Sequence, residues 1–159
     1  MNDTSKLPIV GEYWPGQGGL YAGTIPARGD KPAYHLVLGQ ASATSFEWGA
    51  YADDAVSKSI IDGLANTDAL LGEQGDYPAA RAARAYIADG HTDFYLPSLA
   101  ELFEAWVNLG DQPWGWLWSS SQRSQTFAHY LSFEDGAHGS IDKGHVLGVR
   151  PVRQVPLSD

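Results

Sequence analysis

Two segments, Trp-Gly-Trp-Leu-Trp-Ser-Ser-Ser at residues 114–121 and Val-Leu-Gly-Val-Arg-Pro-Val-Arg at residues 146–153, enclose the most informative part of this chain. Both are rich in the aromatic and β-branched residues that favour strands. The stretch between them mixes amide, guanidinium, imidazole and carboxylate side chains. A core needs few such polar groups, whereas a recognition surface uses many. The two segments therefore predict an apolar scaffold that displays a polar surface.

Composition limits the classes of function. The chain has 159 residues, enough for one domain with a sizeable core. Its formal net charge is −9, with only 10 Lys and Arg together, so we expect neither nucleic-acid binding nor attraction to an anionic membrane. Cysteine is absent, which excludes disulfides, thiolate catalysis and Cys-ligated zinc.

The order of the elements predicts a single α+β domain. We expect a tail at 1–8, the domain at 9–155 and a second tail at 156–159. Ser98 and Glu101 form a capping-box pattern that predicts a helix over 98–108, and a second helix should begin near Pro78 with Asp76 as its cap. The predicted strands are 9–13, 20–23, 34–38, 46–48, 116–119, 127–133, 139–142 and 146–153.

Several motifs resemble a known family. The segments 95–98 with 101–102, 118–121 and 149–153 are similar to the "W-R-L-P-(T/S)-x-x-E-L", "W-S-S-(S/T)" and "x-R-x-V-R" series of the Lcl C-terminal domain family, found in collagen-like bacterial adhesins. Tyr13–Gly19 and Asp62–Thr67 look like the branch of that family in tailed phages. The resemblance spans roughly residues 11–153. One departure is Phe94-Tyr95, where the family usually has Trp-Arg.

The resemblance implies a C-type-lectin-like fold: two helices packed on short antiparallel strands with long irregular loops. It also implies a non-enzymatic ligand-binding module on a phage virion appendage, such as a tail fibre, that recognises a host-surface glycan or protein. Such appendages are homo-oligomers, commonly trimers. Two alternatives stay open: a structural virion protein that binds other capsid or tail subunits, and a hydrolase of surface glycans.

The expected location follows from the N-terminus as well as the resemblance. Residues 1–8 lack the apolar segment of a signal peptide, and no run approaches the roughly 20 apolar residues of a membrane helix. We therefore expect no signal peptide and no membrane insertion. A position on the virion surface or outside the cell would then be reached by another route, such as lysis.

The predicted ligand-binding residues lie mostly between the two opening segments. Trp114 follows Pro113 in an expected loop and should be a surface aromatic, whereas Trp118 should pack in the core. In strand 127–133, alternation places Phe127, His129, Leu131 and Phe133 on a core face and Tyr130 outward. The set predicted to contact ligand is Trp114, Gln122, Arg123, Gln125, Tyr130, His138 and His145.

Catalytic and metal patterns are weak. No Gly-x-Ser-x-Gly, phosphate-loop or dinucleotide motif occurs, and the histidines have no metal-ligand spacing. No cofactor is expected, although Asp53-Asp54 and Glu134-Asp135 supply oxygen ligands that keep calcium open. Arg150 and Arg153 should form a structural ion pair with an acid such as Glu101.

Overall fold

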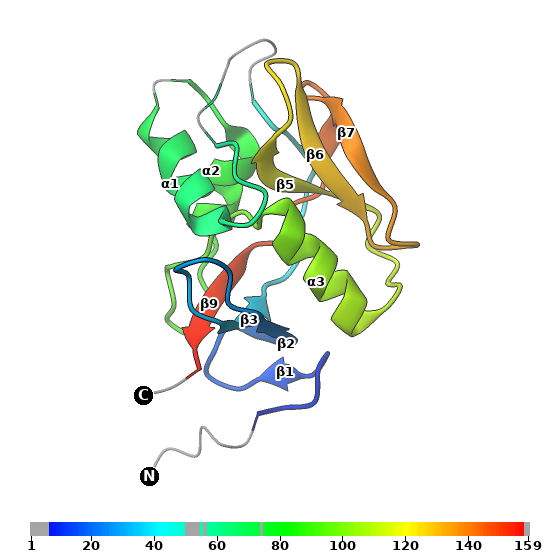
Figure 1. The fold of residues 1–159 in the computed structure, drawn as a ribbon. Helices are drawn as coiled ribbons and strands as arrows, with labels where there is room; N and C mark the ends of the chain where they lie inside the picture. The colour runs from blue at the N-terminus through cyan, green and yellow to red at the C-terminus, as the bar shows by residue number, and fades with distance from the viewer. Residues whose placement is uncertain (1–6, 50–54, 56, 74, 158–159) are drawn as a thin grey trace.

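The computed structural model describes residues 7–49, 55, 57–73 and 75–157 (Figure 1). Within these residues the chain combines three helices with several antiparallel sheets, so the expectation of an α+β class is confirmed. The expectation of two helices was wrong. The additional helix is α1 (Gly63–Gly72), whose N-terminus is capped by the Asp62 side chain accepting from the Ala65 amide.

The four-stranded sheet has the order β1-β2-β3-β9, and all its neighbours are antiparallel. It consists of β1 (Tyr13–Trp14), β2 (Gly19–Ile25), β3 (Tyr34–Leu38) and β9 (Val152–Pro156). Its central strand β3 is the predicted 34–38. Leu36 and Leu38 contribute to one core cluster, and Val37 packs on the opposite face with Trp14 and Tyr21.

The three-stranded sheet has the order β5-β6-β7, from β5 (Trp116–Gln122), β6 (Phe127–Ser132) and β7 (His138–Asp142). The predicted turn at Glu134-Asp135-Gly136 connects β6 to β7. A short pair, β4 (Phe46–Glu47) with β8 (Val146–Leu147), lies beside β5, because Gly148 forms a parallel bridge to Leu117. The C-terminal segment then crosses to the other sheet as β9 (Figure 1).

Helix α3 (Leu99–Leu109) lies between the two larger sheets and contacts β2, β5 and β6 (Figure 1). Its predicted capping box is confirmed: the Ser98 side chain accepts from the Glu101 amide at 3.1 Å, and Glu101 accepts from the Ser98 amide at 3.0 Å. Near the end of α3, Asn108 donates to the Ala22 carbonyl beside Gly23. A Cβ on Gly23 would lie 2.1 Å from the Asn108 amide, so this approach requires glycine.

Two core clusters lie on opposite faces of the three-stranded sheet. Leu117, Leu131 and Phe133 pack into the cluster shared with α3 and the four-stranded sheet. Trp118 and Ala128 pack into the cluster that includes α1 and α2 (Pro78–Ala85). Fully burying one large side chain contributes about 1.5–3 kcal/mol, so both faces of this sheet are strongly anchored.

Three local expectations were wrong. Asp76 does not cap α2, because Tyr77 is the N-cap residue and Asp76 instead pairs with Arg81. Residues 146–153 are not one strand, since β8 and β9 belong to different sheets. Of residues 9–13 only Tyr13 is in a strand. Strand β9 extends to Pro156, which pairs with Tyr34.

Candidate functional site

The tryptophans of β5 divide between core and surface. Trp116 and Trp118 share a face of the strand by alternation. Trp118 is fully buried, and its indole Nε1 donates to the Phe46 carbonyl at 2.7 Å. Trp116 is the first residue of the strand and stays 45% exposed. The packing role predicted for Trp118 is confirmed, and the exposed indole belongs to its neighbour on the same face.

Trp116 and Tyr130 form a stacked aromatic pair. Their ring centroids are 4.4 Å apart and their planes differ by 11°. Tyr130 stands opposite Trp118 and Gly139 in the sheet, and the absence of a side chain at Gly139 leaves room for its ring. Tyr130 is half-buried, and Phe46, Ile141 and Leu147 are further partly buried apolar residues packed on the same core cluster.

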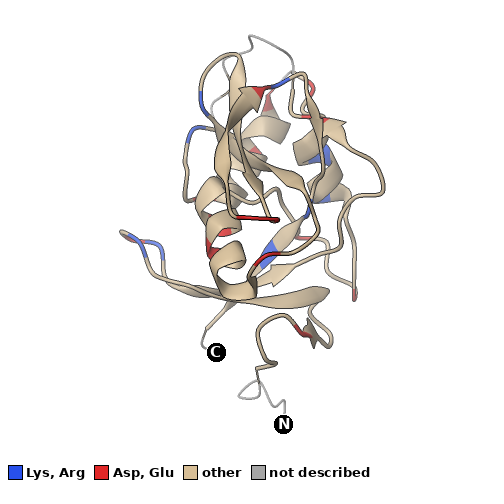
Figure 2. Cartoon of the chain, turned by 90° about the vertical axis from the view of Figure 1, so that its right-hand side faces the viewer, with Lys and Arg blue, Asp and Glu red and all other residues tan. Residues whose placement is uncertain are grey.

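This part of the molecule carries little charge. Apart from Asp142, the strands β5, β6 and β7 contain no Lys, Arg, Asp or Glu, and they are almost entirely tan in Figure 2. The whole chain has a net charge of −9. An apolar aromatic pair in a charge-poor region of an acidic protein favours recognition by stacking and packing over recognition by long-range electrostatics.

The structure separates the other predicted ligand-binding residues. Arg123 and Gln125 are exposed in the β5–β6 turn, and His145 is exposed in the β7–β8 turn; all three lie beyond the end of the sheet where Phe127 pairs with Asp142. His138 is exposed at the opposite end of the sheet, where its ring meets Phe103 of α3 edge to face at 6.3 Å. These residues therefore do not converge on one site.

Two residues that were predicted to contact ligand, Gln122 and Trp114, are packed into the protein instead. Gln122 is only 5% exposed, and its Oε1 accepts from the Ala55 amide at 2.8 Å and the buried Lys143 Nζ at 2.6 Å. Trp114 is half-buried against Phe133, and the Arg150 guanidinium covers its ring at 3.8 Å. Both side chains serve packing in this structure. The predicted core face of β6 is also incomplete, since Phe127 at its first position is 41% exposed.

The arginines of the last segment do not pair with Glu101. Arg153 Nε instead donates to Asp93 at 2.8 Å, and its Nη1 donates to the side chain and carbonyl of Gln17. Arg150 makes no ion pair with a described residue. Hydrogen bonds from Arg153 help to hold the pKa of the Asp93 carboxyl below its usual value, although partial burial opposes this.

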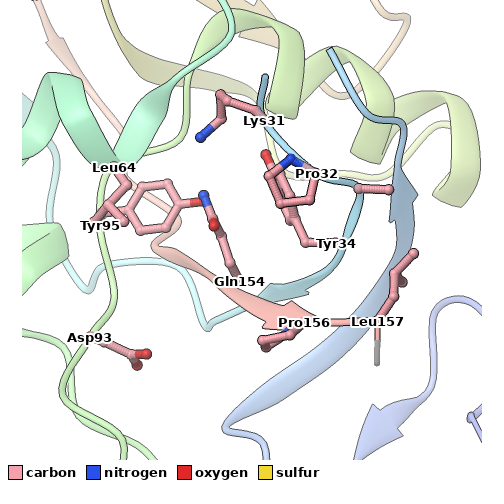
Figure 3. A pocket seen from close by; sticks show the side chains of 10 residues that line it. Lys31, Pro32, Tyr34, Leu64, Asp93, Tyr95, Gln154, Pro156 and Leu157 are labelled. Atoms are coloured by element: carbon pink, nitrogen blue, oxygen red, sulfur yellow. The ribbon is translucent and has the colours of Figure 1, made fainter. Parts of the chain in front are cut away.

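A pocket of about 550 Å³ opens between the four-stranded sheet and α1. Figure 3 shows Lys31, Tyr95 and Gln154 pointing toward one another across it. Behind it, the hydroxyls of Tyr34 and Tyr95 donate to Glu101 Oε2 at 2.5 and 2.6 Å. Burial raises the pKa of Glu101 and of both tyrosines. The buried carboxylate is thus held by three donors, counting the Ser98 amide, which identifies a structural role.

The part of the chain that the structure describes contains neither a candidate metal centre nor a candidate membrane-spanning helix. No group of three His, Cys, Asp or Glu side chains there could hold a metal ion. Asp53 and Asp54, two of the residues considered for calcium, lie outside the described residues. No helix among the described residues is long and apolar enough to span a bilayer. The chain matches no protein-family model and no curated protein.

Sequence reasoning missed Trp116 as the exposed aromatic. Alternation placed Trp116 on the same face as Trp118. The residue pattern did not show that the packing which buries Trp118 does not extend to Trp116. The glycine at position 115 was the available sign in the sequence, because glycine often marks a turn; in the structure Gly115 has a positive φ of 71° just before the strand. Trp116 is the first residue of β5, and it is exposed to solvent.

Proposed function

We propose that this chain is a non-enzymatic ligand-binding module of C-type-lectin-like fold, carried on the surface of a tailed-phage virion, that recognises a host-surface glycan or protein. The ligand-contacting centre is the stacked pair of Trp116 and Tyr130. The observation that carries this proposal is a half-exposed indole held in a fixed orientation by a second aromatic ring.

The physical support is the efficiency of aromatic anchors. Tryptophan and tyrosine bury a large area while few side-chain rotations are lost, and their rings stack on the apolar faces of sugars or on aliphatic side chains. Stacking on Tyr130 already orders the Trp116 ring before a ligand arrives. Preorganisation of this kind reduces the entropic cost of binding. Assembly into a trimer would multiply a weak single-site affinity.

The test is adsorption of the purified protein to host cells, followed by a glycan panel monitored by Trp fluorescence. Trp116→Ala should lower affinity about 30-fold, the effect of losing a hot spot of about 2 kcal/mol. The matched control is Phe127→Ala, which removes a similarly exposed aromatic, 41% against 45%, from the far end of the sheet. Equal losses for both variants, or none for Trp116→Ala, would refute the proposed site.

A second candidate function is docking to another virion subunit, and the outer side of α3 favours it. Phe103 and Val107 are 41% and 54% exposed there, and Ile60, which lies beside Phe103, is 52% exposed. Phe103, Ile60 and His138 line a shallow apolar pocket of about 210 Å³. Phe103→Asp should then block incorporation into particles while leaving adsorption of the free protein intact. Trp116→Ala should have the reverse pattern if the aromatic pair contacts the host.

A further inference from the structure

Strand β7 forms an open edge of the three-stranded sheet. In the order β5-β6-β7 it pairs only with β6, and no described strand pairs with its other side, which lies at the margin of the molecule (Figure 1). The strand contains neither proline nor lysine, and its pairing with β6 has no bulge. Natural proteins usually block an open edge with one of these features. An edge of five residues is therefore available to pair with another strand.

The other sheet edges among the described residues are short or covered. β9 is an edge strand of the four-stranded sheet, but it ends at Pro156, and its first residue, Val152, exchanges backbone hydrogen bonds with Tyr95. The opposite edge strand, β1, has only two residues. On the far side of the three-stranded sheet, Gly148 bridges to Leu117 of β5. Of the described edges, that of β7 is thus the long and regular one.

The backbone groups of β7 alternate between its two sides. In the β6–β7 hairpin the Ser132 amide donates to the Ala137 carbonyl, which sets the phase of this alternation. Odd-numbered residues of β7 direct their amides and carbonyls to β6. The amides and carbonyls of His138, Ser140 and Asp142 therefore face outward.

We infer that β7 pairs antiparallel with β7 of a second copy of this chain, about a two-fold axis at Ser140. This is the one two-fold register that engages all three outward residues. Ser140 then stands opposite Ser140 of the second copy, and His138 stands opposite Asp142. An imidazole N–H can donate to the carboxylate across the strands, and symmetry makes this contact twice. An edge that complements itself in reverse order favours a second copy over an unrelated strand.

The charge distribution supports the same meeting point. The chain has a net charge of −9, so two copies repel one another over much of their surfaces. Asp142 is the only Lys, Arg, Asp or Glu residue in β5, β6 and β7 (Figure 2). The proposed register places this carboxylate against an imidazole instead of another acid. Two acidic chains can therefore approach at this edge with little repulsion.

The apolar patch on α3 adds contact area beside the strands. A stable interface needs at least about 1,000 Å² in total, which a five-residue ladder alone does not bury. The patch reaches the edge at His138, whose ring contacts Phe103. The two-fold axis is perpendicular to the sheet, so the patches of both copies lie on the same side of it. We expect a weak dimer, which would replace the trimer as the source of multivalency because an isologous contact closes on two copies.

The test is sedimentation velocity of the purified full chain over a concentration series. The mass should rise from one chain to two as the concentration increases. A chain that stays monomeric up to about 1 mM, the dissociation constant of a very weak contact, overturns the inference, and so does a trimer.

Ser140→Pro removes the central outward amide without removing a hydrogen bond to β6, and edge strands tolerate proline at such positions. Dimerisation should weaken about 10- to 100-fold, because one amide is lost from each copy. Ser140→Ala is the matched control: it keeps the amide and should dimerise like the wild type. A folded Ser140→Pro variant that dimerises as strongly as Ser140→Ala overturns the inference.

Cysteine cross-linking tests the register, and it covers the case in which Ser140→Pro does not fold. The chain has no cysteine of its own. The two Ser140 Cα atoms would be about 5.5 Å apart in this register, which a disulfide can span, so oxidised Ser140→Cys should form a covalent dimer. The two copies of His138 would be about 14 Å apart, so His138→Cys should not cross-link. No cross-link in Ser140→Cys, or a stronger one in His138→Cys, overturns the pairing.

The dimer does not rest on the proposed function. Trp116 and Tyr130 lie on the face of the sheet opposite to the side chains of His138 and Ser140. If both proposals hold, the two aromatic pairs of a dimer face the same side and can engage a surface together. Trp116→Ala should leave sedimentation unchanged even where it abolishes adsorption to cells. Loss of the dimer in Trp116→Ala would place the contact on the aromatic face and overturn pairing through β7.

Discussion

The buried carboxylate of Glu101 allows a quantitative prediction. Its Oε2 accepts from Tyr34 at 2.5 Å and from Tyr95 at 2.6 Å, and all three residues are 5% exposed or less. Tyr34→Phe removes one of these donors and nothing else. A hydrogen bond to a charged group contributes about 1.5–3 kcal/mol, so we expect the free energy of unfolding at neutral pH to fall by that amount. Urea denaturation followed by Trp fluorescence measures it.

The same variant changes the alkaline limb of the stability profile. Burial, together with the Glu101 charge, raises the pKa of both tyrosines in the folded protein. The folded state therefore holds these protons after the unfolded chain has lost them, so this stabilisation is complete below about pH 10 and is lost as the pH rises further. Each tyrosine contributes a slope of about 1.4 kcal/mol per pH unit. Tyr34→Phe should remove one of the two contributions.

Tyr13→Phe is the matched control, because the Tyr13 hydroxyl also donates to a carboxylate, Asp89, but at a position that is 50% exposed. Water replaces the lost partner there, so the loss of stability at neutral pH should be clearly smaller than for Tyr34→Phe. Equal losses for the two variants would show that burial does not strengthen the Tyr34–Glu101 bond. An unchanged alkaline slope in Tyr34→Phe would contradict the assignment of that proton.

Two further predictions concern residues with structural roles. Gln122→Ala leaves the Ala55 amide without its side-chain acceptor and takes one acceptor away from Lys143. Thermal denaturation should therefore show a loss of about 1–3 kcal/mol in the free energy of unfolding. Adsorption of the folded variant to cells should be unchanged. Ser98→Ala removes the cap of α3, which should reduce the free energy of unfolding by about 1 kcal/mol in urea titrations, whereas Ser124→Ala, in an exposed turn, should have a smaller effect.

Elements with strong local patterns were predicted well. Ser98 and Glu101 defined the start of α3 because a capping box satisfies helix amides from residues close in sequence. The run 34–38 was identified as a strand because β-favouring residues stand between Pro32 and Gly39. Helix α1 was missed because glycines stand at both of its ends and its apolar positions form no clear stripe. The cap at Asp62 was the one local sign of it.

Long-range pairing explains the remaining errors. Residues 146–153 contain three valines and a leucine, which suggested one strand, but β8 pairs with Phe46–Glu47 and β9 pairs with Tyr34–Leu38, about a hundred residues or more earlier in the chain. The acid for Arg153 was likewise unpredictable, since Asp93 reaches it only when the segment after α2 lies beside β9. Local periodicity indicates which residues can form a strand, whereas the partner depends on how the sheets pack.

The contrast between Trp114 and Trp116 shows how one short segment can contribute to both the core and the surface. Trp114 turns inward and covers the Arg150 guanidinium, and Trp116, two residues later, is exposed and stacks on Tyr130. The two positions are connected through the backbone as well, because the Gly148 amide donates to the Trp116 carbonyl only two residues before Arg150.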